Sequence, residues 1–138
     1  MKNIISYIFI LMTLTGCLST YKSPTVGPTA QIKTTKNAVV SNICINQDQN
    51  RLSPDSNGYA IIPAGKEIMM TAQYSEYINN MSYFCIPAVK FIPLESAIYI
   101  QKFNKTGATC TTEIYRKQNE TEVLIATSLP QTFGCNTQ

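Results

Sequence analysis

Apolar and polar residues alternate along most of this chain with a period of two. Ile43 and Ile45 lie between polar Asn42 and Asn46, and Ile68, Met70 and Ala72 repeat the same spacing further on. A period of two is typical of a β-strand with one buried face, whereas an amphipathic helix repeats every 3.6 residues. No stretch of ten residues shows a convincing helical period. The pattern therefore predicts an all-β domain.

The strand-like segments are short and follow one another at intervals of roughly ten residues. Turn-forming residues separate them at 51–58, 63–65, 104–107 and 117–120. The prolines at 87 and 93 predict that 84–93 is an edge strand or two short pieces. Such spacing favours a sandwich or a small barrel, and we expect a small β-sandwich of about seven strands, immunoglobulin-like or transthyretin-like in layout. The expected strands are 37–46, 59–65, 66–74, 84–93, 96–103, 109–117 and 121–129.

The start of the chain has a different pattern. Lys2 is the only charged residue before an almost wholly apolar run at 4–14. A helix that spans a bilayer needs about 20 apolar residues, so this run is too short. A positive charge followed by a short apolar run is typical of a secretory signal peptide.

The apolar run ends in Leu14-Thr15-Gly16-Cys17, which resembles the lipobox of bacterial lipoproteins. The resemblance implies that a diacylglyceryl group is attached to Cys17 and that cleavage occurs just before it. Several acyl chains together hold a protein stably in a bilayer. The alternative is an ordinary signal peptide with a chance cysteine. Leu18 stands where inner-membrane lipoproteins of many Gram-negative bacteria carry Asp, which implies the periplasmic face of the outer membrane if the source is Gram-negative.

The chain is accordingly divided into three parts. Residues 1–16 are the expected signal peptide, 17–36 a lipidated tether and 37–138 the β-domain. The tether is expected because this segment is polar and contains Pro24, Gly27 and Pro28. Fully extended, it would reach about 60 Å from the membrane.

Five cysteines become four once Cys17 is set aside: Cys44, Cys85, Cys110 and Cys135. An even number in an exported protein predicts two disulfides, with three possible pairings. We favour Cys44–Cys85 and Cys110–Cys135, because they close the shorter loops. A zinc site is the alternative, but its thiolates usually come in closely spaced pairs. The chain has no such pair and no histidine, so we expect no metal and no cofactor.

The absence of histidine also excludes Ser-His-Asp and Cys-His catalysis. Ser-Lys chemistry and paired carboxylates remain open in principle. Most of the acidic residues fall in turns or at polar strand positions, where a solvated face explains them. We expect a protein that is not an enzyme. Its formal net charge of +3 is spread along the chain without a basic block, so we expect no nucleic-acid partner.

The segment 73–84 contains Tyr74, Tyr77 and Tyr83, together with Met81 and Phe84. Its strand signals are weak, and we expect a loop. Tyrosine offers a large contact area at low entropic cost, so the three tyrosines are candidates for a partner-binding surface. The alternative is that their rings fold back onto the core.

Two non-catalytic functions fit these features. The first is a membrane-anchored periplasmic lipoprotein that binds another protein as an inhibitor or immunity module. Lysozyme inhibitors and immunity proteins are similar in size, anchor and cysteines, but share no motif with this chain. The second is a structural accessory subunit of an envelope assembly, such as a secretion or pilus machine. In both, the partners are the lipid bilayer, through acylated Cys17, and an envelope or periplasmic protein.

Overall fold

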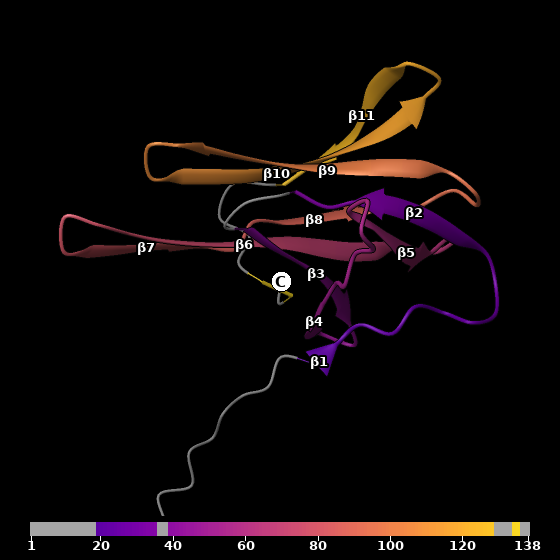
Figure 1. Ribbon diagram of the computed structural model, residues 1–138, viewed down its shortest axis with the longest axis horizontal. Helices are drawn as coiled ribbons and strands as arrows, with labels where there is room; N and C mark the ends of the chain where they lie inside the picture. Colours follow the sequence, from indigo (N-terminus) through magenta and orange to yellow (C-terminus); the bar gives the residue numbers. More distant parts are fainter. Residues whose placement is uncertain (1–18, 36–38, 129–133, 136–138) are drawn as a thin grey trace, which may run out of the picture.

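The protein folds as a β-sandwich of two sheets (Figure 1). The computed structural model describes residues 19–35, 39–128 and 134–135. Within these ranges it contains eleven strands. The described residues include no helix that is long and apolar enough to cross a membrane. The all-β sandwich predicted from the sequence is confirmed, with more strands than the expected seven.

The first sheet has the strand order β1-β4-β3-β6-β7, and β8 also pairs with β6. Strands β7 and β8 follow one another along the same edge of β6, separated by Ile86 and Pro87. Of the two alternatives predicted for 84–93, an edge strand or two short pieces, the structure shows two short strands, and the first begins earlier, at Met81. The bounds are β1 (Ser19–Thr20), β3 (Val39–Ile45), β4 (Asp48–Arg51), β6 (Ile68–Ile78), β7 (Met81–Cys85) and β8 (Ala88–Phe91).

The second sheet has the strand order β11-β10-β9-β2-β5. Strand β2 lies between β5, to which it is antiparallel, and β9, to which it is parallel. The turns predicted at 104–107 and 117–120 overlap the observed turns at 107–108 and 119–120, which connect β9 to β10 and β10 to β11. The bounds are β2 (Thr29–Lys33), β5 (Tyr59–Pro63), β9 (Ile98–Thr106), β10 (Thr109–Gln118) and β11 (Thr121–Thr127).

The core lies between the two sheets. Met70 and Ala72 of β6 are fully buried, so the period of two in this strand marks its core face as predicted. The second sheet contributes fully buried side chains from β2, β5 and β10, namely Ile32, Ile62 and Ile114. Each isoleucine is flanked by residues that face away from the core, as expected for a pleated strand.

Within the segment 17–36, which the sequence suggested is a tether, the described residues 19–35 are part of the folded domain. Strand β1 pairs in parallel with β4, and Tyr21 directly after it is buried. Strand β2 lies inside the second sheet, with Ala30 and Ile32 in the core. The prediction failed because only two core residues alternate with polar ones here, and nearby Pro and Gly outweighed them. The folded domain therefore begins by Ser19.

Two disulfides form, as predicted, but the favoured pairing was wrong. The bonds join Cys44 to Cys135 and Cys85 to Cys110. Cys85 lies opposite Tyr74, on the face of the first sheet that carries Met70 and Ala72. Cys44 lies opposite Met69, on the other face. Cysteines on opposite faces of one sheet cannot bond to each other, because a disulfide needs Cα atoms about 4.4–6.8 Å apart with suitably directed side chains.

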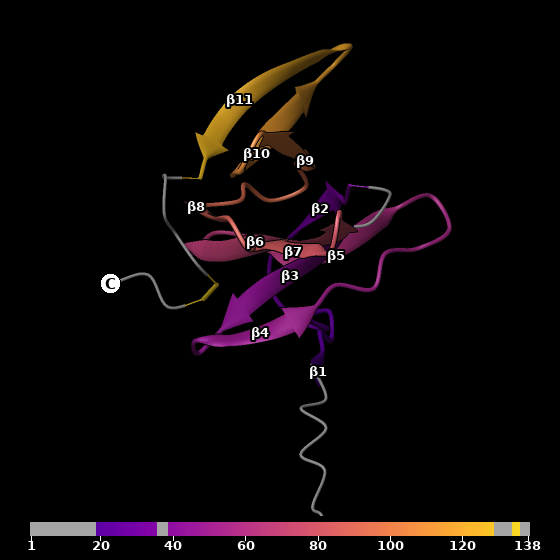
Figure 2. The ribbon, with the colours of Figure 1, turned by 90° about the vertical axis from the view of Figure 1, so that its left-hand side faces the viewer.

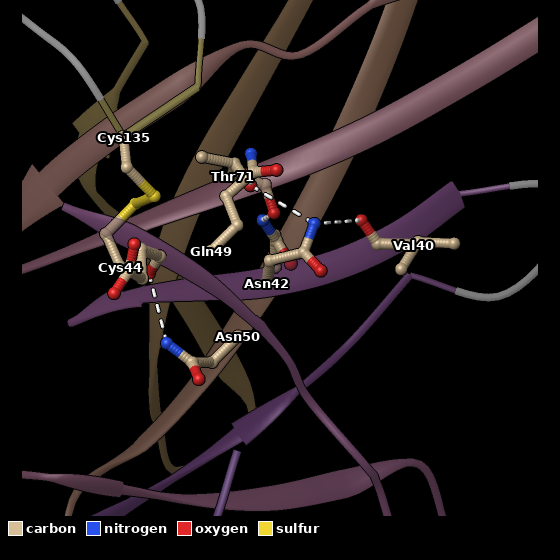
Figure 3. The surroundings of a disulfide bond; sticks show 9 residues. Val40, Asn42, Cys44, Gln49, Asn50, Thr71 and Cys135 are labelled. Atoms are coloured by element: carbon tan, nitrogen blue, oxygen red, sulfur yellow. Dashed lines mark hydrogen bonds between the residues drawn. A yellow bond between two sulfur atoms is a disulfide. The ribbon is translucent and has the colours of Figure 1, made fainter. Parts of the chain in front are cut away.

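The Cys44–Cys135 bond fixes Cys135, and with it Gly134, to the outer face of the first sheet (Figure 3). Beside it lies a polar cluster in which Asn42 and Gln49 each donate an amide hydrogen bond to Thr71 Oγ1, at 3.3 and 3.2 Å. Asn42 and Thr71 are fully buried even though they face away from the main core. This face of the sheet is therefore covered near Cys44 rather than exposed to solvent.

Candidate functional site

The tyrosine-rich segment forms a β-hairpin rather than the expected loop. Strands β6 and β7 pair from Tyr74↔Cys85 to Ile78↔Met81. Asn79 and Asn80 connect them, with φ angles of 50° and 61°. Two consecutive positive φ angles define a type I′ hairpin turn, and Asn tolerates this conformation better than most residues. The Asn-Asn pair was thus the sequence signal for a hairpin.

The pleat of the hairpin divides the three tyrosines between its two faces. Tyr74 and Tyr83 lie on the inner face, which also carries Glu76 and Cys85. Tyr77 lies on the outer face, where it is a diagonal neighbour of Phe84. The structure therefore does not bring the three predicted residues together as one surface.

The inner face is held against the hairpin formed by β9 and β10. The Tyr74 ring stacks on Phe103 with centroids 5.2 Å apart. Lys105 forms an ion pair with Glu76, and its Nζ lies 5.5 Å from the Tyr74 ring centroid and 5.3 Å from that of Tyr83. The Tyr74 and Tyr83 rings are therefore better explained by packing within the molecule than by a partner-binding surface.

A covalent bond completes this support. The Cys85–Cys110 disulfide joins the end of β7 in the first sheet to β10 in the second. Figure 1 shows the two hairpins running side by side, with the β6–β7 hairpin extending beyond the tip of the other. The projecting end of the β6–β7 hairpin therefore extends from a base that is held in place by the disulfide and by the contacts with the β9–β10 hairpin.

Electrostatics at the base agree with the packing. The hydrogen bond from Lys105 holds the pKa of the Glu76 carboxyl below its usual value, and the same bond raises the pKa of Lys105. A hydrogen bond to Glu76 raises the pKa of the Tyr74 hydroxyl. Each shift favours the ion pair and keeps the tyrosine neutral, so the three groups act as a structural unit.

The projecting part of the hairpin exposes four large apolar side chains. Tyr77 is 69% exposed and Phe84 59%, both on the outer face. Ile78 and Met81 are 40% and 56% exposed beside the turn. By the strand register, Ile78 and Met81 belong to the inner face, at its free end. The four residues therefore cover both faces of the projecting hairpin, and we refer to them together as the hairpin surface. The outer face also carries Ser75 and Ser82 but no charged residue, so burying it against a partner leaves no unpaired charge.

A shallow depression of about 380 Å³ lies at the base of the hairpin surface. Phe84 and Ile86 line one part of it, and Gln47, Asp48 and Gln49 line another, next to Gly134 and Cys135. It extends the hairpin surface towards the β3–β4 turn. An apolar patch with a polar rim is the usual anatomy of a protein interface.

A second exposed apolar segment lies at the far edge of the other sheet. Strand β11 pairs with β10 alone among the described strands. Its Val123, Leu124 and Ile125 are 40%, 50% and 38% exposed. The register with β10 shifts at this point, as in a β-bulge. The sequence alone does not reveal this exposure, because an apolar run predicts a strand without showing which strand lies at the open edge of the sheet.

The remaining predicted site residues have simpler outcomes. Cys44, Cys85, Cys110 and Cys135 are all in disulfides, whereas Cys17 lies outside the described residues. In the part of the chain that the structure describes, no group of three or more potential ligands could hold a metal ion. Comparison with protein-family models, curated proteins and solved structures finds no match.

Proposed function

We propose that this protein is a membrane-anchored lipoprotein that binds another cell-envelope protein through the β6–β7 hairpin. The hairpin surface carries the proposal: large apolar side chains project on a supported base. Binding residues commonly lie on segments held out by a rigid scaffold. A segment that is already ordered loses less conformational entropy on binding, which favours affinity.

The anchor rests on the lipobox-like Leu14-Thr15-Gly16-Cys17 after a short apolar run. The two disulfides support an oxidising compartment, since such bonds persist outside the cytosol. The identity of Leu18 favours the periplasmic face of the outer membrane. There the protein would act as an inhibitor or immunity module without catalysis, consistent with a chain that lacks histidine.

The binding function is tested with matched variants of the full chain. Tyr77→Ala/Phe84→Ala removes both outer-face aromatics, and Val26→Ala/Ile61→Ala removes two exposed apolar side chains elsewhere. A partner captured from envelope extract by the wild type should bind the first variant at least tenfold more weakly, as loss of interface hot spots predicts. The control should bind like the wild type. Equal affinity of all three proteins contradicts the proposal.

The anchor is tested separately by Cys17→Ser. The wild type should carry acyl mass at Cys17 and fractionate with membranes, whereas the variant should lack the acyl mass and leave the membrane fraction. A wild type without acyl mass contradicts the lipoprotein proposal. That result does not affect the proposal that the hairpin surface binds a protein, which the variants above test separately.

The alternative function is a structural accessory subunit of an envelope assembly, and strand β11 favours it. An open edge presents unpaired backbone groups to which a neighbouring subunit can add a strand. Under this alternative, Leu124→Lys should abolish co-assembly, while the hairpin double variant should not. The opposite pattern supports the hairpin as the binding site.

A further inference from the structure

We infer that the anchored domain rests directly on the membrane, with the β1–β4 edge of the first sheet against the lipid headgroups. This inference depends on the proposed lipidation of Cys17. It concerns a surface and a partner that the lipobox alone does not specify, because a lipid anchor is compatible with a long flexible stem.

The chain is fixed from Ser19 onward. Ser19 and Thr20 pair with Asn50 and Arg51 of β4, and the Ser19 hydroxyl donates a 2.5 Å hydrogen bond to the Asn50 side chain. The backbone N–H of Tyr21 donates to the carbonyl of Arg51 at 2.8 Å. The Tyr21 side chain is only 9% exposed and belongs to the core. The start of the described chain is thus held by pairing, hydrogen bonds and burial.

The remaining chain is too short to act as a stem. Only Leu18 separates Cys17 from Ser19 in the sequence. Consecutive Cα atoms are about 3.8 Å apart, so the Cα atoms of residues 17 and 19 are at most about 7.6 Å apart. Each headgroup layer of a bilayer is about 5–7 Å thick. A lipidated Cys17 at the membrane surface therefore places Ser19 at the outer limit of the headgroups.

The residues around this edge suit a headgroup surface. Ser19 and Thr20 are exposed and polar, Arg51 lies opposite Thr20, and Lys22 follows Tyr21, both with exposed side chains. Asp48, at the start of β4, is an exposed acid on the same edge, and exposed Lys66 and Glu67 line a pocket together with Lys22. Basic side chains beside a lipid anchor add electrostatic attraction to anionic lipids. The edge thus offers polar contacts, and its surroundings carry three cations, Lys22, Arg51 and Lys66, against the carboxylates of Asp48 and Glu67.

The anchor point also orients the rest of the molecule. In both Figure 1 and Figure 2, β1 lies at the bottom of the molecule and the β10–β11 hairpin at the top. In Figure 1 the β6–β7 hairpin projects to the left, away from the line that runs from β1 at the bottom to β11 at the top. With β1 on the bilayer, the hairpin surface extends roughly parallel to the membrane and the open edge of β11 points away from it.

Energy transfer to the membrane tests this orientation. The full-length lipoprotein is reconstituted into vesicles of phosphatidylethanolamine and phosphatidylglycerol that contain a headgroup-linked acceptor dye. A donor dye is attached through an unnatural amino acid at Thr20 or at Asn119, in the β10–β11 turn. We expect transfer from Thr20 to be at least several-fold more efficient than from Asn119. Inserting about ten Gly and Ser residues between Leu18 and Ser19 should largely remove the difference, because such a linker is flexible.

Equal transfer from Thr20 and Asn119 in the acylated, vesicle-bound protein overturns the inference, because it means that the domain reorients freely. An unchanged difference after linker insertion also overturns it, since the short connection would then not set the orientation. Mass analysis of the same sample separates this failure from that of the proposed anchor. Protein without acyl mass that does not float with the vesicles refutes both proposals.

Discussion

At the scale of single residues, strand parity determines what each tyrosine does. Tyr74 and Tyr83 share the inner face of the β6–β7 hairpin with Glu76, and Tyr77 faces the other way. The sequence shows that these aromatic residues are clustered, and a loop was expected there. In a loop, side chains do not alternate between two faces. Once the residues pair as strands, alternate side chains must separate. Tyr77 and Phe84 then form the outer face, and Tyr74 and Tyr83 form the support.

Truncation of the two kinds of tyrosine should have opposite effects. Tyr74→Ala removes the stack on Phe103 and should lower the free energy of unfolding by about 1–3 kcal/mol. Tyr77→Ala removes an exposed ring and should change it by less than about 0.5 kcal/mol. Urea unfolding of both variants provides the measurement. A large loss for Tyr77→Ala would mean that its ring packs in the molecule and is not free for a partner.

The ion pair at the base predicts a specific pH dependence. Because Lys105 holds the pKa of Glu76 below the ordinary value of 4.5, the pair stabilises the folded protein above that value. The contribution is lost as the pH falls through the lower folded-state pKa. A carboxyl NMR titration should place the Glu76 midpoint below 4.5. In Lys105→Met the midpoint should move upward, and an identical midpoint in both proteins would contradict the pair.

At the scale of elements, the most consequential strand is one that the sequence did not suggest. Strand β2 bridges β5 and β9, and so connects the two parts of the second sheet. Its pattern is only five residues long and follows Pro24, Gly27 and Pro28. Longer strands such as β6, β9 and β10 were located from their alternation. A short strand between distant partners depends on contacts that local sequence does not encode.

The role of β2 predicts a clear stability effect. Ile32→Ala removes a fully buried side chain and should cost about 2–5 kcal/mol of unfolding free energy. Val26→Ala, at a position that is 88% exposed in the same segment, is the matched control and should change stability by less than about 0.5 kcal/mol. Thermal and urea unfolding distinguish the two. A neutral Ile32→Ala would restore the tether interpretation of this segment.

At the scale of the whole molecule, the disulfides show where sequence reasoning stops. Their number followed from setting Cys17 aside, but their pairing depends on which sheet and which face each cysteine occupies. Loop length favoured Cys44–Cys85 and Cys110–Cys135, whereas strand parity excludes the first of these bonds. Sheet order and register are long-range properties, so the fold class was predictable and the connectivity was not.

The pairing itself is a prediction for chemistry. Proteolysis of the unreduced protein should release peptides linked as Cys44–Cys135 and Cys85–Cys110. The Cys85–Cys110 bond joins the two sheets, so Cys85→Ser/Cys110→Ser should lower the melting temperature, since losing such a bond typically costs about 2–5 kcal/mol. Mass spectrometry of the linked peptides decides the pairing. Recovery of a Cys44–Cys85 peptide as the main product would contradict the sheet arrangement described above.

The hairpin surface is proposed as the site through which this protein binds another envelope protein. The most direct measurement is photo-crosslinking in intact cells, with a photoreactive phenylalanine at position 77 and, in a matched strain, at position 26. Both positions are highly exposed, at 69% and 88%. One discrete protein adduct is expected from position 77 and none from position 26. No adduct from position 77, or the same adduct from both positions, would contradict the proposal.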